Sequence, residues 1–297
     1  MANVVEGISK ELASIVEAAG PAVVRVEGRR RLPASGIVWS EGGIVVTAHH
    51  VVEREDRLSV GLADDQQVDA ELVGRDPTTD LAVLRVEGVG LSPAAPAALD
   101  DLSVGHLVLA LGRPGRTVQA TLGIVSALGT SWRTAAGGTI DRYLQTDVVM
   151  YPGFSGGPLV NAEGKVLGLN TSALRGVSLS IPNSTVDRIV ESILSHGKVQ
   201  RGYLGVGVQP VKLPEALAEE LGQETGLILI SVEPGSPAEA GGLTLGDTLL
   251  SLHGDPVPRL DDLLSLLSSE LVGEEVIVRV LRGGGVREQK VTIGERQ

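Results

Sequence analysis

The chain contains no cysteine and very few aromatic residues. Its 297 residues include one phenylalanine, two tryptophans and three tyrosines. Without cysteine the protein forms no disulfide and performs no thiol chemistry, so its stability must come from packing. The redox state of its compartment cannot be read from the sequence for the same reason. Hydrophobic residues make up 42% of the chain. This is enough apolar material to bury the cores of about two domains.

The sequence also lacks an excess of positive charge and any long apolar run. Its net charge of −12 argues against a nucleic-acid partner, which would require a basic patch. No run approaches the roughly 18 apolar residues of a membrane span. Residues 1–19 have the pattern of a short amphipathic helix and lack a basic-then-apolar leader. We therefore expect no membrane partner and a cytoplasmic location, the alternative being the cell envelope after removal of a leader.

A serine lies in a glycine-rich turn, Phe154-Ser155-Gly156-Gly157-Pro158-Leu159, directly before a β-like run. A serine that attacks a carbonyl needs backbone N–H donors aimed at the oxyanion, and small neighbours let the carbonyl come close. Gly153 and Ser155 can supply these donors, whereas Pro152 has no N–H. Glycine-rich turns with a serine are also common outside active sites, so the turn alone does not decide its role.

Two further segments supply the partners that such a serine needs. The apolar run Val45-Val46-Thr47-Ala48 leads into the pair His49-His50, and Asp80 precedes the apolar run Leu81-Ala82-Val83-Leu84. In an acyl-transfer triad the imidazole takes the serine proton, and a buried carboxylate fixes the tautomer and stabilises the imidazolium. The order histidine, aspartate, serine fills each role once.

These segments resemble the HtrA/Deg family of trypsin-fold serine proteases that carry a C-terminal PDZ domain. The matching motifs run through most of the chain: Ser35-Gly36-Ile37-Val38, Thr47-Ala48-His49-His50-Val51, Asp80-Leu81-Ala82-Val83-Leu84, Gly105-His106-Leu107-Val108-Leu109-Ala110-Leu111-Gly112, Gln145-Thr146-Asp147 and Ser155-Gly156-Gly157-Pro158-Leu159. Several independent motifs in one order make the resemblance specific. It implies a mainly β fold, a trypsin-like double six-stranded β-barrel followed by a small α+β PDZ domain.

The resemblance also assigns the site residues. It implies a triad of His50, Asp80 and Ser155, with the amides of Gly153 and Ser155 as oxyanion-hole donors. Strand neighbours point to opposite faces, which predicts that His49 is structural. Val149, six residues before the nucleophile, is expected at the base of the specificity pocket. An uncharged pocket there predicts cleavage after small aliphatic residues, because burying an unpaired Lys or Arg is costly.

Patterning supports the domain division. Residues 1–20 form the N-terminal helical segment, 21–198 the protease domain and 201–297 the PDZ domain. Short apolar runs separated by turn residues are typical of an all-β domain. The predicted strands are 22–26, 36–38, 44–47, 58–62, 82–86, 107–111, 123–127 and 166–170. Residues 186–196 have the 3.6-residue period of a helix that stops at Gly197.

Residues Tyr203-Leu204-Gly205-Val206 correspond to the peptide carboxylate-binding loop of a PDZ domain. In this recognition mode backbone N–H groups receive the C-terminus and a strand pairs with the peptide. Leu263 and Leu267, on one face of a helix predicted over 260–271, are candidates for the pocket that receives the last side chain. That both leucines are instead buried core stays open.

The predicted function is that of an ATP-independent serine endopeptidase that cleaves unfolded or misfolded proteins, with apolar peptide C-termini as PDZ ligands. The alternative is a non-proteolytic peptide-binding chaperone or scaffold on a protease fold. The scattered histidines show no metal-ligand spacing, so neither a metal nor another cofactor is expected.

Three departures from the family bear on regulation. Phe154 stands where the family usually has Asn and trypsin relatives Asp, so an ion pair with a new N-terminus is not expected to activate the enzyme. The loop Arg29-Arg30-Arg31-Leu32-Pro33 is short where some members insert a long regulatory segment, which argues against caged oligomers. Family trimers often rest on N-terminal aromatics, and none precedes Arg25, so a homotrimer is implied by the resemblance alone.

Overall fold

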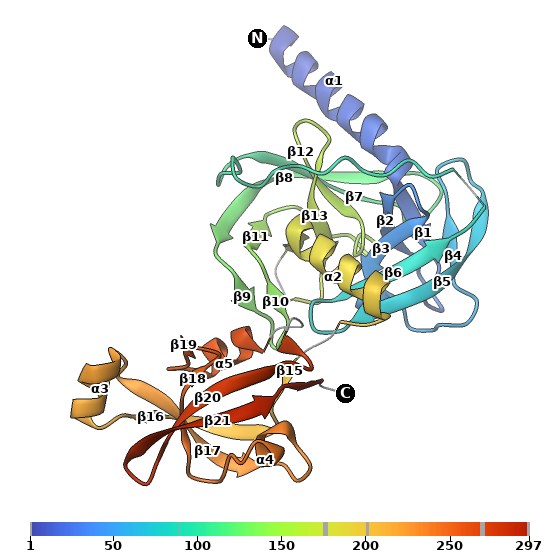
Figure 1. Ribbon diagram of the computed structural model, residues 1–297. Helices are drawn as coiled ribbons and strands as arrows, with labels where there is room; N and C mark the ends of the chain where they lie inside the picture. The colour runs from blue at the N-terminus through green and yellow to red at the C-terminus, as the bar shows by residue number, and fades with distance from the viewer. Residues whose placement is uncertain (1, 89, 175–177, 200–201, 268–270, 296–297) are drawn as a thin grey trace. The chain divides into compact units, whose positions relative to one another are not determined.

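The computed structural model describes residues 2–88, 90–174, 178–199, 202–267 and 271–295. The chain forms two compact units, Met1–Val199 and Gln200–Gln297, labelled by element in Figure 1. The first unit ends one residue after the limit of 198 expected for the protease domain. The predicted mainly β architecture is confirmed, with two closed six-stranded barrels and a separate β-rich unit.

The first barrel has the strand order β1-β2-β3-β6-β5-β4. Its strands are β1 (Val23–Val26), β2 (Ala34–Ser40), β3 (Ile44–Ala48), β4 (Ser59–Gly61), β5 (Gln67–Asp76) and β6 (Leu81–Val86). All of β3 is buried, which is why it reads as a continuous apolar run. β5 was not predicted, because polar residues alternate along it and its side chains are largely half-exposed.

The second barrel has the order β11-β14-β13-β12-β7-β8. Its strands are β7 (Leu107–Gly112), β8 (Gln119–Gly129), β11 (Tyr143–Thr146), β12 (Pro158–Asn161), β13 (Val166–Thr171) and β14 (Leu179–Pro182). The short strands β9 (Trp132–Arg133) and β10 (Thr139–Ile140) pair with each other outside it. Residues 87–106 join the two barrels without a strand of their own, although residue 89 lies outside the described part. A linker over 88–99 is what the Pro- and Gly-rich composition there indicates.

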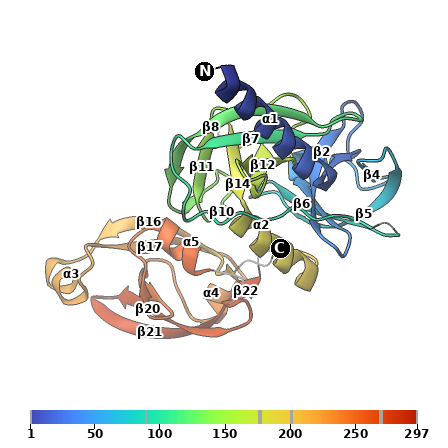
Figure 2. The same cartoon turned by 90° about the horizontal axis from the view of Figure 1, so that it is seen from above.

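Two helices accompany the barrels (Figure 2). α1 (Ala2–Ala19) lays Leu12, Ile15 and Val16 against a cluster that includes residues of β1 and β7. A 3-10 turn, η1 (Gly20–Ala22), then leads into β1. α2 (Asn183–His196) begins three residues before the predicted start and ends at Gly197, whose positive φ of 72° closes the helix with an N–H bond to Ile193. None of the helices within the described residues is long and apolar enough to cross a membrane.

The second unit is built on the strand order β16-β17-β18-β20-β21, with β19 added to β18 and a separate β15–β22 pair. The strands are β15 (Gly202–Tyr203), β16 (Val206–Lys212), β17 (Thr225–Val232), β18 (Thr248–Leu252), β19 (Asp255–Pro256), β20 (Glu275–Arg282), β21 (Gly285–Thr292) and β22 (Gly294–Glu295). Its helices are α3 (Glu215–Leu221), α4 (Pro237–Ala240) and α5 (Leu260–Leu266). The helix predicted over 260–271 is therefore shorter, and residues 268–270 lie outside the described part.

An ion pair with a buried carboxylate joins the residue just before β18 to the last residue of β20. Asp247 accepts hydrogen bonds from Arg282 Nε and Nη2, both at 2.6 Å, and one from the backbone N–H of Thr244 at 2.8 Å. Burial alone would raise the pKa of Asp247, but the bonds from Arg282 and Thr244 outweigh it and hold the pKa below 3.8. The ionised carboxylate therefore stabilises the folded unit at neutral pH.

Candidate active site

Strand pairing in the first barrel brings His50 next to Asp80. β3 and β6 pair up to Ala48 and Leu81, so the residues just beyond this pair meet. The ring Nδ1 of His50 lies 2.9 Å from Oδ2 and 3.0 Å from Oδ1 of Asp80, and the backbone N–H of His50 donates to Oδ1 at 2.9 Å. Asp80 thus fixes both the ring and the backbone of His50.

The local structure around the two histidines differs from the expected strand. His49 and His50 lie in a 3-10 turn, η2 (His49–Val51), so alternation along a strand is not what separates them. His49 donates its backbone N–H to the Asp80 carbonyl at 3.0 Å, while its own Nδ1 is buried without a partner among the described residues. Burial, and next the Arg75 guanidinium, lower the pKa of His49. A neutral, half-buried ring fits the expected structural role.

The Asp80 side chain is held by hydrogen bonds that could be predicted only in part from the sequence. Its side chain is nearly inaccessible, and its φ of +62° lies in the left-handed region, where Asp is tolerated better than most residues. Thr171, the last residue of β13, donates its hydroxyl to Asp80 Oδ2. The available signal for Thr171 was its polar side chain at the end of an otherwise apolar run. The second barrel therefore helps to orient the carboxylate of the first.

Ser155 follows a tight turn made by residues 151–154. The N–H of Phe154 donates to the carbonyl of Tyr151 at 3.0 Å, with Pro152 and Gly153 between them and a φ of +91° at Gly153. Proline followed by a positive-φ glycine is the pattern of a type II turn. A Cβ at Gly153 would also lie 2.5 Å from Pro114 Cβ, so this position requires glycine for both conformation and space.

Ser35, from β2, ties this turn to the first barrel. Its hydroxyl donates to the Gly153 carbonyl at 2.6 Å and accepts the Arg113 N–H at 2.8 Å. The Ser35 N–H also donates to the Ser155 carbonyl at 3.2 Å. The approach is so close that a Cβ on Gly156 would lie 2.1 Å from the Ser35 carbonyl oxygen. Sequence analysis identified Ser35 only as part of a motif. Its full burial and these hydrogen bonds make it a positioning residue.

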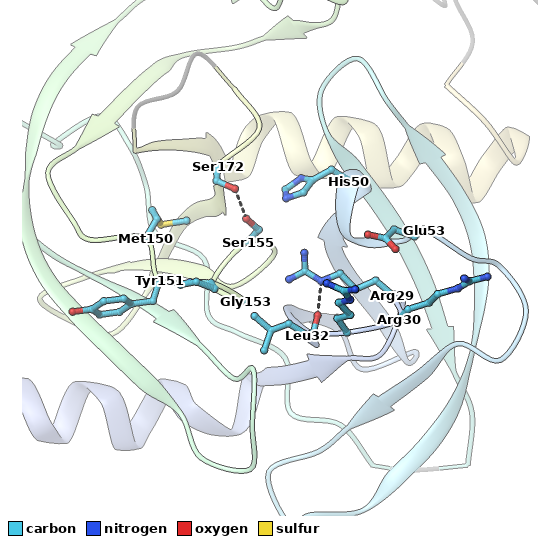
Figure 3. Close-up of a pocket in the computed structure, with 12 residues that line it drawn as sticks. Arg29, Arg30, Leu32, His50, Glu53, Met150, Tyr151, Gly153, Ser155 and Ser172 are labelled. Carbon is cyan, nitrogen blue, oxygen red and sulfur yellow. Dashed lines mark hydrogen bonds between the residues drawn. The ribbon is translucent and has the colours of Figure 1, made fainter.

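The Ser155 hydroxyl faces the same cavity as His50 (Figure 3). It shares a hydrogen bond of 3.0 Å with the Ser172 hydroxyl. Within the described part of the chain, the His50 ring forms hydrogen bonds to Asp80 alone, so the serine–histidine bond is not formed in this state. Catalytic hydrogen bonds commonly tighten only when substrate is bound.

The cavity has a volume of about 590 Å³ and takes residues from both barrels. It is lined by Arg29, Arg30, Arg31, Leu32, His50, Glu53, Met150, Tyr151, Pro152, Gly153, Ser155 and Ser172. Val149, predicted at the base of the specificity pocket, does not belong to this set. Its side chain is 54% exposed, and its carbonyl accepts the Thr121 hydroxyl at 3.0 Å. The neighbouring Met150 supplies the apolar lining.

Phe154 points away from the cavity into the second barrel. Its side chain is fully buried, and its ring packs edge-to-face against Tyr151 with centroids 5.8 Å apart. Gly112, at the end of β7, leaves room for it, because a Cβ there would lie 2.8 Å from the ring. The position that carries a polar residue in the resembled family is thus an apolar anchor for the Ser155 turn.

In the second unit, residues Tyr203 to Val206 lead from β15 into β16. Leu204 is buried, and its carbonyl accepts the Ala238 N–H at 2.9 Å. Gly205 has a φ of +78°, and its carbonyl accepts the Glu233 N–H at 2.8 Å. β16 is an edge strand of its sheet, so one of its edges is open to another strand.

The two leucines proposed for the peptide pocket differ. Leu263 is 2% exposed and belongs to the core of the second unit, as the alternative interpretation had it. Leu267 follows the last residue of α5 and packs, partly buried, against the same core. Among the described residues no cluster of His, Asp or Glu could hold a metal ion.

The two units match two known domain families. Residues 34–169 match the trypsin-like peptidase domain, and residues 202–293 match the PDZ domain. A solved structure described as the HtrA-type protease AlgW with decapeptide superposes with a TM-score of 0.80 at 29% identity, over 96% of this chain and 98% of that one. A serine endoprotease from Yersinia pestis superposes with a TM-score of 0.78 at 30% identity, over 95% of this chain and 97% of that one. The chain belongs to the HtrA-type serine proteases.

Curated relatives extend this family likeness along the chain. A protein of Ectopseudomonas mendocina named probable periplasmic serine endoprotease DegP-like is 37% identical over 300 residues, which covers 97% of this HtrA-type chain. The chain spans 63% of that relative's length. That relative is named as periplasmic, whereas the sequence alone led us to expect the cytoplasm for this chain.

Proposed function

We propose that the protein is a serine endopeptidase that cleaves unfolded or misfolded proteins without ATP. The observation that carries this proposal is the His50–Asp80 pair, with its 2.9 Å hydrogen bond, on the same cavity as Ser155. The glycine turn that precedes Ser155 supports it, because the amides of Gly153 and Ser155 then flank the nucleophile as oxyanion donors.

The reaction follows from these roles. His50 takes the proton from Ser155 Oγ as the oxygen attacks the scissile carbonyl, and Asp80 stabilises the imidazolium that forms. The Gly153 and Ser155 amides hold the oxyanion. His50 then protonates the leaving amine, and water hydrolyses the acyl-enzyme by the same sequence in reverse.

We propose that the residue before the cut is a small aliphatic one such as Val, Ala or Leu. Met150 offers an apolar surface next to Ser155, and Val149 precedes it. Among the described residues, those that the second barrel contributes to the cavity include no carboxylate that would pair with Lys or Arg. An unpaired cation would be costly to bury there.

For the second unit we propose that residues Tyr203 to Val206 bind the carboxylate of an apolar peptide C-terminus. The open edge of β16 supports this role, because a peptide can add to it as a further strand. The full-length protein is expected to bind a peptide ending in Val or Phe, and amidation of that C-terminus is expected to weaken binding by roughly 1.5–3 kcal/mol for each charge-assisted hydrogen bond lost. Equal affinity for the free and amidated peptides in fluorescence anisotropy would contradict the carboxylate-binding role.

We further propose that the protein works in the cell envelope and forms a homotrimer. The periplasmic naming of its relatives supports the location. Exposed apolar residues on the first turns of α1, Val4, Val5 and Ile8, support contact with other copies, although none of them is aromatic.

The decisive experiment compares wild type with Ser155→Ala on denatured casein and with a fluorophosphonate probe. Loss of the serine is expected to reduce turnover by about 10⁶ and to abolish labelling. Ser195→Ala, at an exposed position near the end of α2, serves as the matched control and is expected to keep both activities. If the probe labels neither the wild type nor the control, the result favours the alternative, a peptide-binding chaperone on a protease fold.

A further inference from the structure

The first-barrel wall of the cavity is cationic. Arg29, Arg30 and Arg31, in the loop between β1 and β2, all line it, and Glu53 is the one carboxylate among the lining residues. Three guanidinium groups against one carboxylate stand out in a chain with a net charge of −12. This wall of the cavity that holds Ser155 therefore has a local excess of positive charge.

Two of these arginines are free to bind a ligand. Arg30 and Arg31 are exposed, and within the described part of the chain neither side chain forms an ion pair or a hydrogen bond. By contrast, Arg75 pairs with Glu55 at 2.5 Å. Arg29 donates to the carbonyl of Leu32 and so shapes the loop from within.

The arginines lie on the side of the leaving group. Figure 3 shows Arg29 and Arg30 on the same side of the cavity as His50, with Met150 and Tyr151 on the opposite side. His50 must stand next to the leaving nitrogen in order to protonate it. The loop 29–32, on the same side of the cavity as His50, is therefore the wall nearest to the substrate residues that follow the scissile bond.

We propose that Arg30 and Arg31 form a subsite for acidic side chains on the C-terminal side of the scissile bond. This inference rests on the proposed protease function and specifies its substrate class. Guanidinium groups bind carboxylates through paired, charge-assisted N–H bonds. Because the chain has a net charge of −12, it repels acidic segments overall, and this loop offers them a local cationic site.

The test uses internally quenched peptides with one common sequence up to the cut and with two Asp, two Ala or two Lys residues after it. Wild type is expected to show roughly a threefold to tenfold higher kcat/KM for the Asp peptide than for the Ala peptide at low salt, because exposed ion pairs are weak and additive. At 0.5 M salt the preference is expected to fall, because screening shortens the reach of exposed charges. The Lys peptide is expected to be the slowest.

The variant Arg30→Gln/Arg31→Gln replaces both guanidinium side chains with shorter, neutral polar ones and so removes both charges. It is expected to cleave the three peptides at equal rates while fluorophosphonate labelling of Ser155 stays at the wild-type rate. Arg287→Gln, on exposed β21, is the matched charge control. A preference for the Asp peptide that survives in the double variant would overturn the subsite. So would the absence of this preference in wild-type protein that the fluorophosphonate probe labels.

Binding separates failure of the subsite from failure of the protease assignment. The Ser155→Ala background leaves the Asp peptide uncleaved, so its binding can be measured by fluorescence anisotropy. Introducing Arg30→Gln/Arg31→Gln in this background is expected to weaken the affinity for the Asp peptide roughly threefold to tenfold. This expected loss of affinity does not depend on whether the fluorophosphonate probe labels the wild-type protein. Unchanged affinity for the Asp peptide would refute the subsite even if the enzyme is active.

Discussion

Phe154 and Gly112 provide a quantitative test of how the Ser155 turn is held. Phe154 is fully buried, and removing a buried phenylalanine side chain costs about 3–5 kcal/mol. Its edge-to-face contact with Tyr151, with centroids 5.8 Å apart, adds about 0.5–1.5 kcal/mol. We therefore expect Phe154→Ala to lower the free energy of unfolding of the first unit by about 4 kcal/mol.

The catalytic effect should exceed the loss of folded protein. Phe154 is joined directly to Gly153 and Ser155, so an empty cavity beneath the turn lets both oxyanion donors move. Losing one such donor costs about 10²–10³ in turnover. Phe154→Ala is expected to slow fluorophosphonate labelling at least tenfold under conditions where the variant is still folded, whereas Phe154→Leu retains most of the rate.

Gly112→Ala probes the same contact from the other side. The added Cβ would lie 2.8 Å from the ring of Phe154 and 3.1 Å from Ser35 Oγ. Overpacking of this kind costs about 1–3 kcal/mol. In the Phe154→Leu background the methyl group meets a smaller side chain, so a double-mutant cycle by urea unfolding is expected to give a coupling of at least 0.5 kcal/mol. Additive effects of the two substitutions would refute the proposed packing.

Further outcomes are expected at three other positions. Ser35→Ala removes the hydroxyl that holds the Gly153 carbonyl, so labelling should slow while KM changes little; a raised KM with unchanged kcat would contradict this positioning role. Ser172→Ala removes the competing partner of the nucleophile, and labelling should be as fast or faster; a tenfold loss would mean that this hydroxyl positions it. Asp247→Asn should destabilise the second unit by about 3 kcal/mol at pH 7, measured by hydrogen exchange of β18. Because the folded pKa of Asp247 is depressed, this difference should shrink progressively as pH falls below about 4, the ordinary range of an unfolded Asp; a difference that stays constant from pH 7 to pH 2 would contradict the role of its charge.

Sequence patterns predicted some strands and missed others, and burial accounts for only part of the difference, because the fully buried β14 was missed and part of the half-exposed β8 was predicted. β3 and β6 were predicted because they are nearly continuous apolar runs, whereas the alternating polar residues of β5 concealed a ten-residue strand. The histidine–aspartate contact could be predicted from the motif order. The roles of Ser35 and Thr171 could not, because each depends on a partner about a hundred residues away that only the barrel closure brings within reach.

The contacts of the turn before Ser155 bear on how the enzyme becomes active. An ammonium group brought to position 154 would meet an apolar cluster and no carboxylate, and burying an unpaired charge there is prohibitive. The turn is instead held by the buried ring of Phe154, the Pro152-Gly153 pair and the bond from Ser35, all of which form as the barrels fold. What remains is the hydroxyl of Ser155, which must leave Ser172 for His50. We infer that substrate binding, and not cleavage of the N-terminus, drives this exchange of partners and completes the triad.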